Sequence, residues 1–255
     1  MRNRRPSGLD AATAALRRAA VERLVVMTRP ELELFVQHWY HDFTPLGLPT
    51  PQRWGMFAPN QGAKQEPVCR LVAEALRLAG ERGERPTVLE LFCADGFYTI
   101  YAAQHGASAA FGIDTDPAEI DKARLAAKLL GVPNASFEVA DVLTSHARAG
   151  VGICAGGLYH LTDPAALLAR LRRQIDHALV VQTVFHLTRT ETDYFETPAP
   201  GLTWGSRFSY EYLLAMVEGS GWRIVSAERN ELPGNDRPED RGSAYLLCVP
   251  AGPAL

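Results

Sequence analysis

The stretch that decides the fold is VLELFCADGFYT, residues 88–99. Its mainly apolar start predicts a buried strand, and the residues that follow predict a turn leading into a helix. A turn that binds the pyrophosphate of a dinucleotide holds three glycines, because backbone N–H groups must approach the phosphates closely. Here the turn holds only Gly96, together with the acids Glu90 and Asp95. The stretch therefore predicts a strand end that binds a ligand other than a pyrophosphate.

Composition predicts a soluble chain with a substantial core. Of the 255 residues, 47% are hydrophobic and 22% are charged, which is ordinary for a globular protein. The net charge of −3 argues against a surface that neutralises nucleic-acid phosphates. Cys69, Cys93, Cys154 and Cys248 lie too far apart for metal-ligand spacing, so we expect no metal site and a reducing compartment. No run reaches the roughly 20 apolar residues of a membrane span. We expect a cytoplasmic monomer or homodimer.

Residues 1–85 predict a helical extension that forms a lid. An alanine-rich helix is expected over 9–27 and a second over 30–43, with Thr28 as its cap and Pro30 in its first turn. A loop rich in proline, glycine and aromatic residues follows over 44–62, and loops of this length are usually functional or disordered. A helix over 66–82 ends this part of the chain.

From residue 86 to residue 255, strands alternate with helices. Strands are expected over 87–92, 109–114, 135–141, 151–156, 178–185, 222–228 and 244–250, and helices over 97–106, 117–130, 162–174 and 208–219. The second of these helices has Asp116 as its cap, with Glu119 completing a capping box. This alternation is typical of an α/β, Rossmann-like, doubly wound and mostly parallel seven-stranded sheet with helices on both faces.

Acids follow the first three expected strands, where ligands bind in such sheets. Asp114 ends the second strand and suits a ribose diol, while Asp141 and Val142 after the third suit an adenine amino group and ring. A single acid of this kind is more often a helix cap. Three acids in this order beside Gly96 favour an adenosine cofactor without phosphates, which needs acceptors for hydroxyl and amino groups.

At this point the chain resembles the class I S-adenosylmethionine-dependent methyltransferases. The similarity lies in LELFCADGFYT, in GGLYHLTDP (residues 156–164) and in the segment from HWYHDF to PQRWGMF, and it is nearest the tRNA wobble-uridine carboxymethyltransferase-like branch. The resemblance covers roughly residues 35–185. It implies S-adenosyl-L-methionine as the cofactor. The cofactor-binding residues would be Glu90, Cys93, Asp95, Gly96, Asp114, Asp141, Val142 and Gly156.

Phe92 is a departure from this pattern, because the family normally has the first glycine of the turn there. Many aromatic residues also fall near strand ends or in covering segments: Trp39, Tyr40, Trp54, Phe57, Phe97, Tyr98, Phe185, Tyr194 and Trp204. Aromatic faces attract a sulfonium cation, although core packing explains such residues equally well. Tyr159, His160 and His41 are the candidate catalytic residues, since histidine titrates near neutral pH. A structural role is the more frequent one for either histidine.

Several functions remain open from the sequence. The leading hypothesis is methyl transfer to a small-molecule substrate, in specialised metabolism. The first alternative is a non-methyl use of the same cofactor, by aminocarboxypropyl transfer or by cyclisation to azetidine-2-carboxylate with release of methylthioadenosine. A tRNA-modifying methyltransferase is weaker because the chain lacks a basic stripe. A binding protein that has lost catalysis, and a dehydrogenase, find least support.

Overall fold

The N-terminal part of the chain is a short helix, a loop and a long helix. The computed structural model describes residues 27–52, 57–81, 83, 85–235 and 237–252, so the helix expected over 9–27 lies outside the described residues. The elements here are α2 (Arg29–Phe35), the 3-10 turn η1 (Thr44–Leu46) and α3 (Phe57–Gly80). Thr28 caps α2 in a capping box with Glu31, and Pro30 lies in the first turn, as predicted.

The helix predicted over 30–43 ends early, and this prediction was wrong for residues 36–43. The backbone N–H groups that a longer helix would use donate elsewhere: Trp39 N bonds Pro51 O at 2.8 Å, and Tyr40 N bonds Asp95 Oδ2 at 2.8 Å. Distant partners therefore replace the local helical ones. The cover predicted as a helical lid is a loop over 36–52, apart from η1. α3 begins at Phe57 rather than at 66 and contains Pro67.

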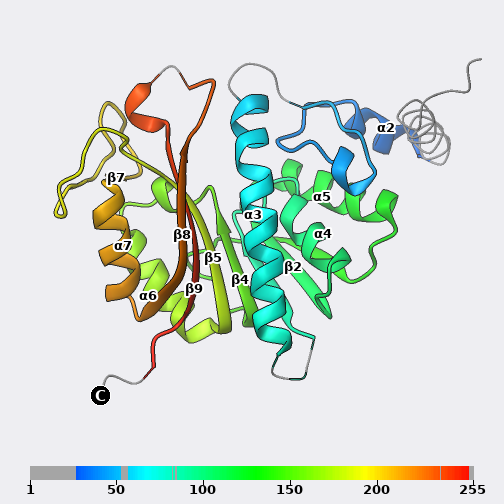
Figure 1. Ribbon diagram of the computed structural model, residues 1–255. Coiled ribbons are helices and arrows are strands. Elements are labelled where there is room, and N and C mark those ends of the chain that lie inside the picture. Colours follow the sequence, from blue (N-terminus) through cyan, green and yellow to red (C-terminus); the bar gives the residue numbers. More distant parts are fainter. Residues whose placement is uncertain (1–26, 53–56, 82, 84, 236, 253–255) are drawn as a thin grey trace, which may run out of the picture.

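A seven-stranded sheet forms the centre of the described structure (Figure 1). Its order is β3-β2-β1-β4-β5-β9-β8, in which β5–β9 and β9–β8 are antiparallel and the other pairs parallel. The strands are β1 (Thr87–Leu91), β2 (Ala109–Asp114), β3 (Ala135–Val139), β4 (Ala149–Ala155), β5 (Ile175–Phe185), β8 (Trp222–Glu231) and β9 (Gly242–Pro250). The order reverses between β1 and β4, so ligands should bind at the carboxyl ends of these strands.

Helices cover both faces of the sheet (Figure 1). One core cluster joins the sheet to α3, α4 (Phe97–Gln104) and α5 (Pro117–Leu130), and it also takes in Trp39 and Phe43 from the N-terminal loop. The other cluster joins the opposite face to α6 (Pro164–Gln174) and α7 (Tyr210–Gly219). The Rossmann-like, doubly wound architecture is thus as predicted. None of the helices in the described residues is long and apolar enough to span a membrane.

Smaller elements lie at the carboxyl ends of the strands. They are the 3-10 turns η2 (Leu158–His160) and η3 (Pro238–Asp240) and the two-residue strands β6 (Phe195–Glu196) and β7 (Arg207–Phe208), which pair with each other. β3 ends before the predicted Asp141. The capping box predicted for α5 is wrong, because Asp116 N donates to Asp114 Oδ1 at 3.0 Å and Glu119 instead pairs with Lys122 at 2.9 Å. Asp116 itself caps α5, as predicted.

Candidate cofactor and acceptor site

The turn after β1 keeps a glycine-type backbone with only one glycine. The φ angles of Phe92, Ala94 and Gly96 are +58°, +45° and +78°. Left-handed φ values cost a residue with a side chain about 1–2 kcal/mol. At Gly96 no side chain is tolerated, since a Cβ atom there would lie 2.5 Å from the Phe137 ring. Every second residue of the turn therefore has the positive φ angle that glycine adopts easily, although two of these positions hold phenylalanine and alanine.

Three carboxylates hold this turn in place. Glu90 Oε2 accepts hydrogen bonds from the N–H of Thr99 at 2.6 Å and from its hydroxyl at 2.5 Å, so it satisfies the first turn of α4. Asp114 Oδ2 accepts from Ala94 N at 2.9 Å. Asp95 is fully buried and binds the N-terminal loop. Each acid that the sequence placed near the cofactor thus has a partner within the fold, and Asp114, which is half-buried, keeps lone pairs for a ligand.

The three acids lie close enough to act on one another electrostatically. Burial raises the pKa of Glu90 to about 8, and the charges of Asp95 and Asp114 also raise it, whereas the hydrogen bonds from Thr99 lower it. Burial and the same three acids raise the pKa of the Cys93 thiol well above its usual range, so it is no thiolate nucleophile. Glu90 is therefore protonated at pH 7, and the negative charge of the turn, which repels phosphate and favours a cationic group, comes from Asp95 and Asp114.

Asp95 fastens the N-terminal loop over the turn. Its Oδ2 accepts from the backbone N–H groups of Tyr40 and His41, at 2.8 and 2.9 Å, and its Oδ1 lies 2.6 Å from His41 Nδ1. The imidazole is buried and stacks on Phe97 at 5.2 Å. His41, predicted as a catalytic residue, therefore lies next to the turn with one ring nitrogen engaged by a carboxylate.

The other predicted cofactor residues lie at neighbouring strand ends. Asp141 is exposed, and its Oδ1 accepts from Leu143 N at 2.8 Å in a turn after β3. Val142 is buried in the core cluster of α6 and α7. Gly156 follows β4, where a Cβ atom would meet only Gln182 Oε1 at 3.9 Å. Asp141, Val142 and Gly156 thus follow β3 and β4 at the same edge of the sheet as the acids that follow β1 and β2.

An aromatic wall stands beside the turn, formed by Tyr159, His160 and Trp204. The rings of Tyr159 and His160 are 4.2 Å apart, and His160 stacks on Trp204 at 5.1 Å and 14°. The wall reaches the turn through Gly157, because a Cβ atom there would lie 1.9 Å from the Phe92 ring. Two of the candidate catalytic residues are therefore adjacent to the predicted cofactor site.

The protonation states of the wall suit acid–base chemistry. Burial, with the positive charges of Arg207 and Lys64, lowers the pKa of His160, so its imidazole is neutral at pH 7 and can accept a proton. Burial raises the pKa of Tyr159 to about 12, so its phenol can only donate a hydrogen bond or accept one as a neutral group.

Two cations near the wall were missed from the sequence. Arg207 lies 5.4 Å from the Tyr159 ring centroid and makes a buried bidentate pair with Asp240, at 2.5 and 3.0 Å. Lys64, on α3, is only 8% exposed. Its position four residues before Val68, on the apolar stripe of α3, was the signal available for Lys64. Arg207 had no such signal, because its partner Asp240 lies 33 residues further along the chain, beyond α7 and β8.

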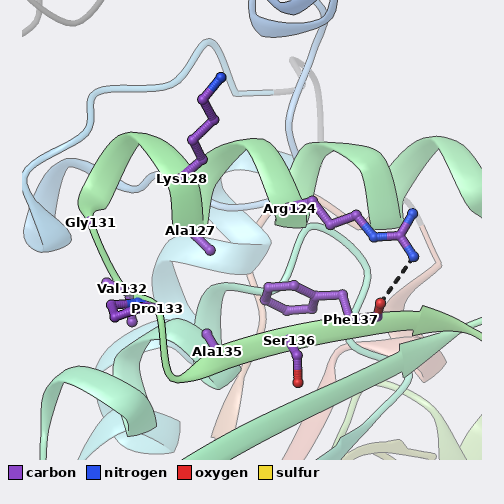
Figure 2. Close-up of a pocket in the computed structure, with 9 residues that line it drawn as sticks. All are labelled: Arg124, Ala127, Lys128, Gly131, Val132, Pro133, Ala135, Ser136 and Phe137. Atoms are coloured by element: carbon purple, nitrogen blue, oxygen red, sulfur yellow. Dashed lines mark hydrogen bonds between the residues drawn. The ribbon is translucent and has the colours of Figure 1, made fainter.

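A separate hollow of about 640 Å³ lies between the C-terminal half of α5 and the start of β3 (Figure 2). Arg124 crosses it and donates to Phe137 O at 3.0 Å. Because it opens at the amino end of β3, opposite the strand ends that carry the acids, we do not assign the cofactor to it.

The remaining aromatic residues divide between the core and the surface. Trp39, Phe97, Tyr98 and Phe185 are buried core residues. His186 and Tyr194 pack edge to face at 5.3 Å on the segment after β5. Trp54 and the side chain of Phe57 lie outside the described residues. Packing thus explains four of the aromatic residues, while Tyr159, His160 and Trp204 face the site.

The chain is similar to solved methyltransferases over most of its length. Magnesium protoporphyrin IX methyltransferase ChlM from Synechocystis PCC 6803, solved with S-adenosylhomocysteine bound, has 18% identity and a TM-score of 0.57, over 76% of this chain and 85% of that chain. The N-terminal domain of EvdMO1 has 20% identity and a TM-score of 0.57, over 97% and 100%. The cyclase SpnF has 20% identity and a TM-score of 0.60, over 84% and 95%.

These likenesses show a shared fold. Structural neighbours were crystallised with S-adenosylmethionine or with S-adenosylhomocysteine bound. The methyltransferase-domain family model matches residues 63–227, and the chain belongs to that family. The comparison with curated proteins finds no match.

Proposed function

We propose that this protein transfers the methyl group of S-adenosylmethionine to a small molecule. The observation that carries the proposal is the aromatic wall of Tyr159, His160 and Trp204, which meets the acidic turn through Gly157 and Phe92. Together with the N-terminal loop fastened by Asp95, it borders the strand ends where the cofactor is expected. Structural neighbours named as methyltransferases include magnesium protoporphyrin IX methyltransferase ChlM and the N-methyltransferase NodS.

The chain's own residues fit such a cofactor. Asp114 would accept from the ribose hydroxyls, Asp141 and Val142 would hold the adenine, and the acids around Cys93 would stabilise the positive sulfur. When bound, the cofactor supplies a methyl group on a positively charged sulfur. The protein's part is alignment and exclusion of water, with His160 as the group that can take a proton from the acceptor.

The test has two stages. Calorimetry with S-adenosylhomocysteine should show binding, and mass spectrometry of the protein with S-adenosylmethionine and a panel of small acceptors should show S-adenosylhomocysteine formation. The substitution His160→Gln should lower the turnover number and leave the affinity for the cofactor unchanged. Tight cofactor binding with no product from any acceptor would count against methyl transfer.

A second candidate is favoured by Phe92. Its ring takes the position of the first glycine of the turn and lies directly on Gly157, where the methionine chain of the cofactor is expected. A ring there could redirect that chain so that its own amine attacks the Cγ carbon. The bond formed would be N–Cγ and the bond broken S–Cγ, giving azetidine-2-carboxylate and methylthioadenosine. Incubation with S-adenosylmethionine alone decides between the two, because only this cyclisation forms azetidine-2-carboxylate together with methylthioadenosine, above the level of a protein-free control.

The resemblance to the wobble-uridine branch receives no support from the comparisons. The described structure also places aromatic and acidic groups, rather than a run of cations, at the strand ends. A tRNA substrate would require a basic surface. We therefore rank nucleic-acid modification below both small-molecule reactions.

A further inference from the structure

Lys64 is a charged residue on an otherwise apolar helix stripe. Along α3 the buried side chains Val68, Leu71, Val72 and Ala75 face the sheet, and Lys64 lies one turn before Val68 on the same stripe. Its side chain is only 8% exposed. A lysine in this position is aimed at the sheet rather than at solvent, which is costly unless the ammonium finds a partner.

The part of the sheet below Lys64 is polar. On the α3 side of β5, Ala178 and Val180 belong to the apolar core, whereas Gln182 comes next and bonds Ser243 of β9 at 2.9 Å. The neighbouring carbonyl of Ala63 accepts from Tyr245 Oη at 3.4 Å, and this contact holds this turn of α3 over β9. Lys64 therefore lies over the carboxyl end of β5, where the sheet changes from apolar to polar.

No anion in the described part of the chain is paired with Lys64. Burial is the one cause that lowers its pKa, to about 8, and no carboxylate acts against it. Arg207, the other buried cation nearby, is already committed to Asp240. The end of β5 below Lys64 is joined to the segment that carries the aromatic wall, because Gly156 N donates to Gln182 O at 3.0 Å. Lys64 is thus the cation that remains for a ligand.

The position of Lys64 separates it from the cofactor. The acids assigned to the cofactor lie on β1, β2 and β3, whereas Lys64 lies over β5 and β9, and β4 stands between the two groups in the sheet. We propose that Lys64 binds a carboxylate of the acceptor, so that the substrate of this enzyme is a small carboxylic acid. This inference rests on the proposed methyl transfer, and a charge-assisted ammonium–carboxylate hydrogen bond is its physical basis.

The probe is benzoate, because it combines a carboxylate with a flat ring that can stack on the wall. Calorimetry with the full chain saturated with S-adenosylhomocysteine should show benzoate binding at least tenfold more tightly than benzamide. This preference should persist in Lys64→Arg and vanish in Lys64→Met. Lys128→Met is the matched control, since Lys128 is exposed and paired with Glu31 on the surface.

Three results would overturn the inference. Equal affinity of the wild-type protein for benzoate and benzamide would show that the site does not recognise a carboxylate. An unchanged preference for benzoate in Lys64→Met would show that Lys64 does not bind the carboxylate. A tenfold or larger loss of S-adenosylhomocysteine affinity in Lys64→Met, with methylthioadenosine affinity unchanged, would assign Lys64 to the methionine carboxylate of the cofactor. A wild-type protein that does not bind S-adenosylhomocysteine would instead overturn the proposed function, and benzoate would then be titrated into the protein alone to judge Lys64 separately.

Discussion

Replacing Lys64 by methionine should stabilise the fold in a pH-dependent way. Burial lowers the pKa of Lys64 from 10.5 to about 8. Each pKa unit corresponds to about 1.4 kcal/mol, so keeping the ammonium charged inside the fold costs about 3 kcal/mol. Methionine has a similar length and no charge. Lys64→Met should therefore raise the free energy of unfolding at pH 7 by up to about 3 kcal/mol. For a chain of this size, each kcal/mol raises the Tm by about 2–4 °C.

The pH dependence separates this cost from ordinary repacking. Between pH 8 and 10.5 the unfolded chain binds more protons at Lys64 than the folded chain does, so the wild-type protein gains stability as pH rises through this interval. The advantage of Lys64→Met should thus shrink to about 1.4 kcal/mol at pH 9.5. Urea unfolding of both proteins at pH 7 and pH 9.5 measures it. An advantage of equal size at both pH values, or a variant less stable at pH 7, would refute the reasoning. Lys128→Met should change stability by only about 0–1 kcal/mol.

Further predictions concern the acidic turn. Asp114→Ala should weaken S-adenosylhomocysteine binding by about 1.5–3 kcal/mol in calorimetry, because charge-assisted hydrogen bonds to the ribose are lost; an unchanged affinity would remove Asp114 from the ribose. Asp95→Asn should destabilise the fold by about 2–3 kcal/mol and speed proteolysis within residues 36–52, because the loop loses its charged acceptor at His41; wild-type protection would contradict this anchor. Ala94→Gly should raise stability by about 0.5–1 kcal/mol, since relief of the +45° φ outweighs the added freedom of glycine. A lower Tm would show that the backbone carries no such strain.

The architecture was predictable because each element carries its own signal. The apolar run before the turn, the Asp116 cap and the alternation of strand and helix patterns predicted the sheet and its helices close to their observed bounds. Residues 36–43 were not predictable in this way. Their helical pattern is overridden by Asp95, which lies 54 residues from His41 and takes two backbone N–H groups that a helix would need. Local propensity carries no information about such a partner.

The candidate site was predictable to the extent that its residues follow strands directly. Glu90, Asp95 and Asp114 could be found because the carboxyl ends of parallel strands share one edge of the sheet. Lys64 and Arg207 could not be found by this rule. One lies on a helix that begins nine residues before the predicted start, at Phe57 rather than 66, and the other lies on a two-residue strand within an irregular segment. Both reach the site only through tertiary packing.

The acids of the turn explain together why one glycine is enough. Glu90 holds the start of α4, Asp114 holds the backbone of Ala94, and Asp95 holds the covering loop, so hydrogen bonds to carboxylates stabilise a backbone that glycines would adopt freely. Because burial keeps Glu90 protonated at pH 7, Asp95 and Asp114 give the β1–β3 half of the strand ends its negative charge, which repels pyrophosphate and attracts a positive sulfur. The β5–β9 half instead presents Lys64. Charge alone would therefore favour a cationic methyl donor at the β1–β3 half and an anionic acceptor at the β5–β9 half, with the neutral His160 between them.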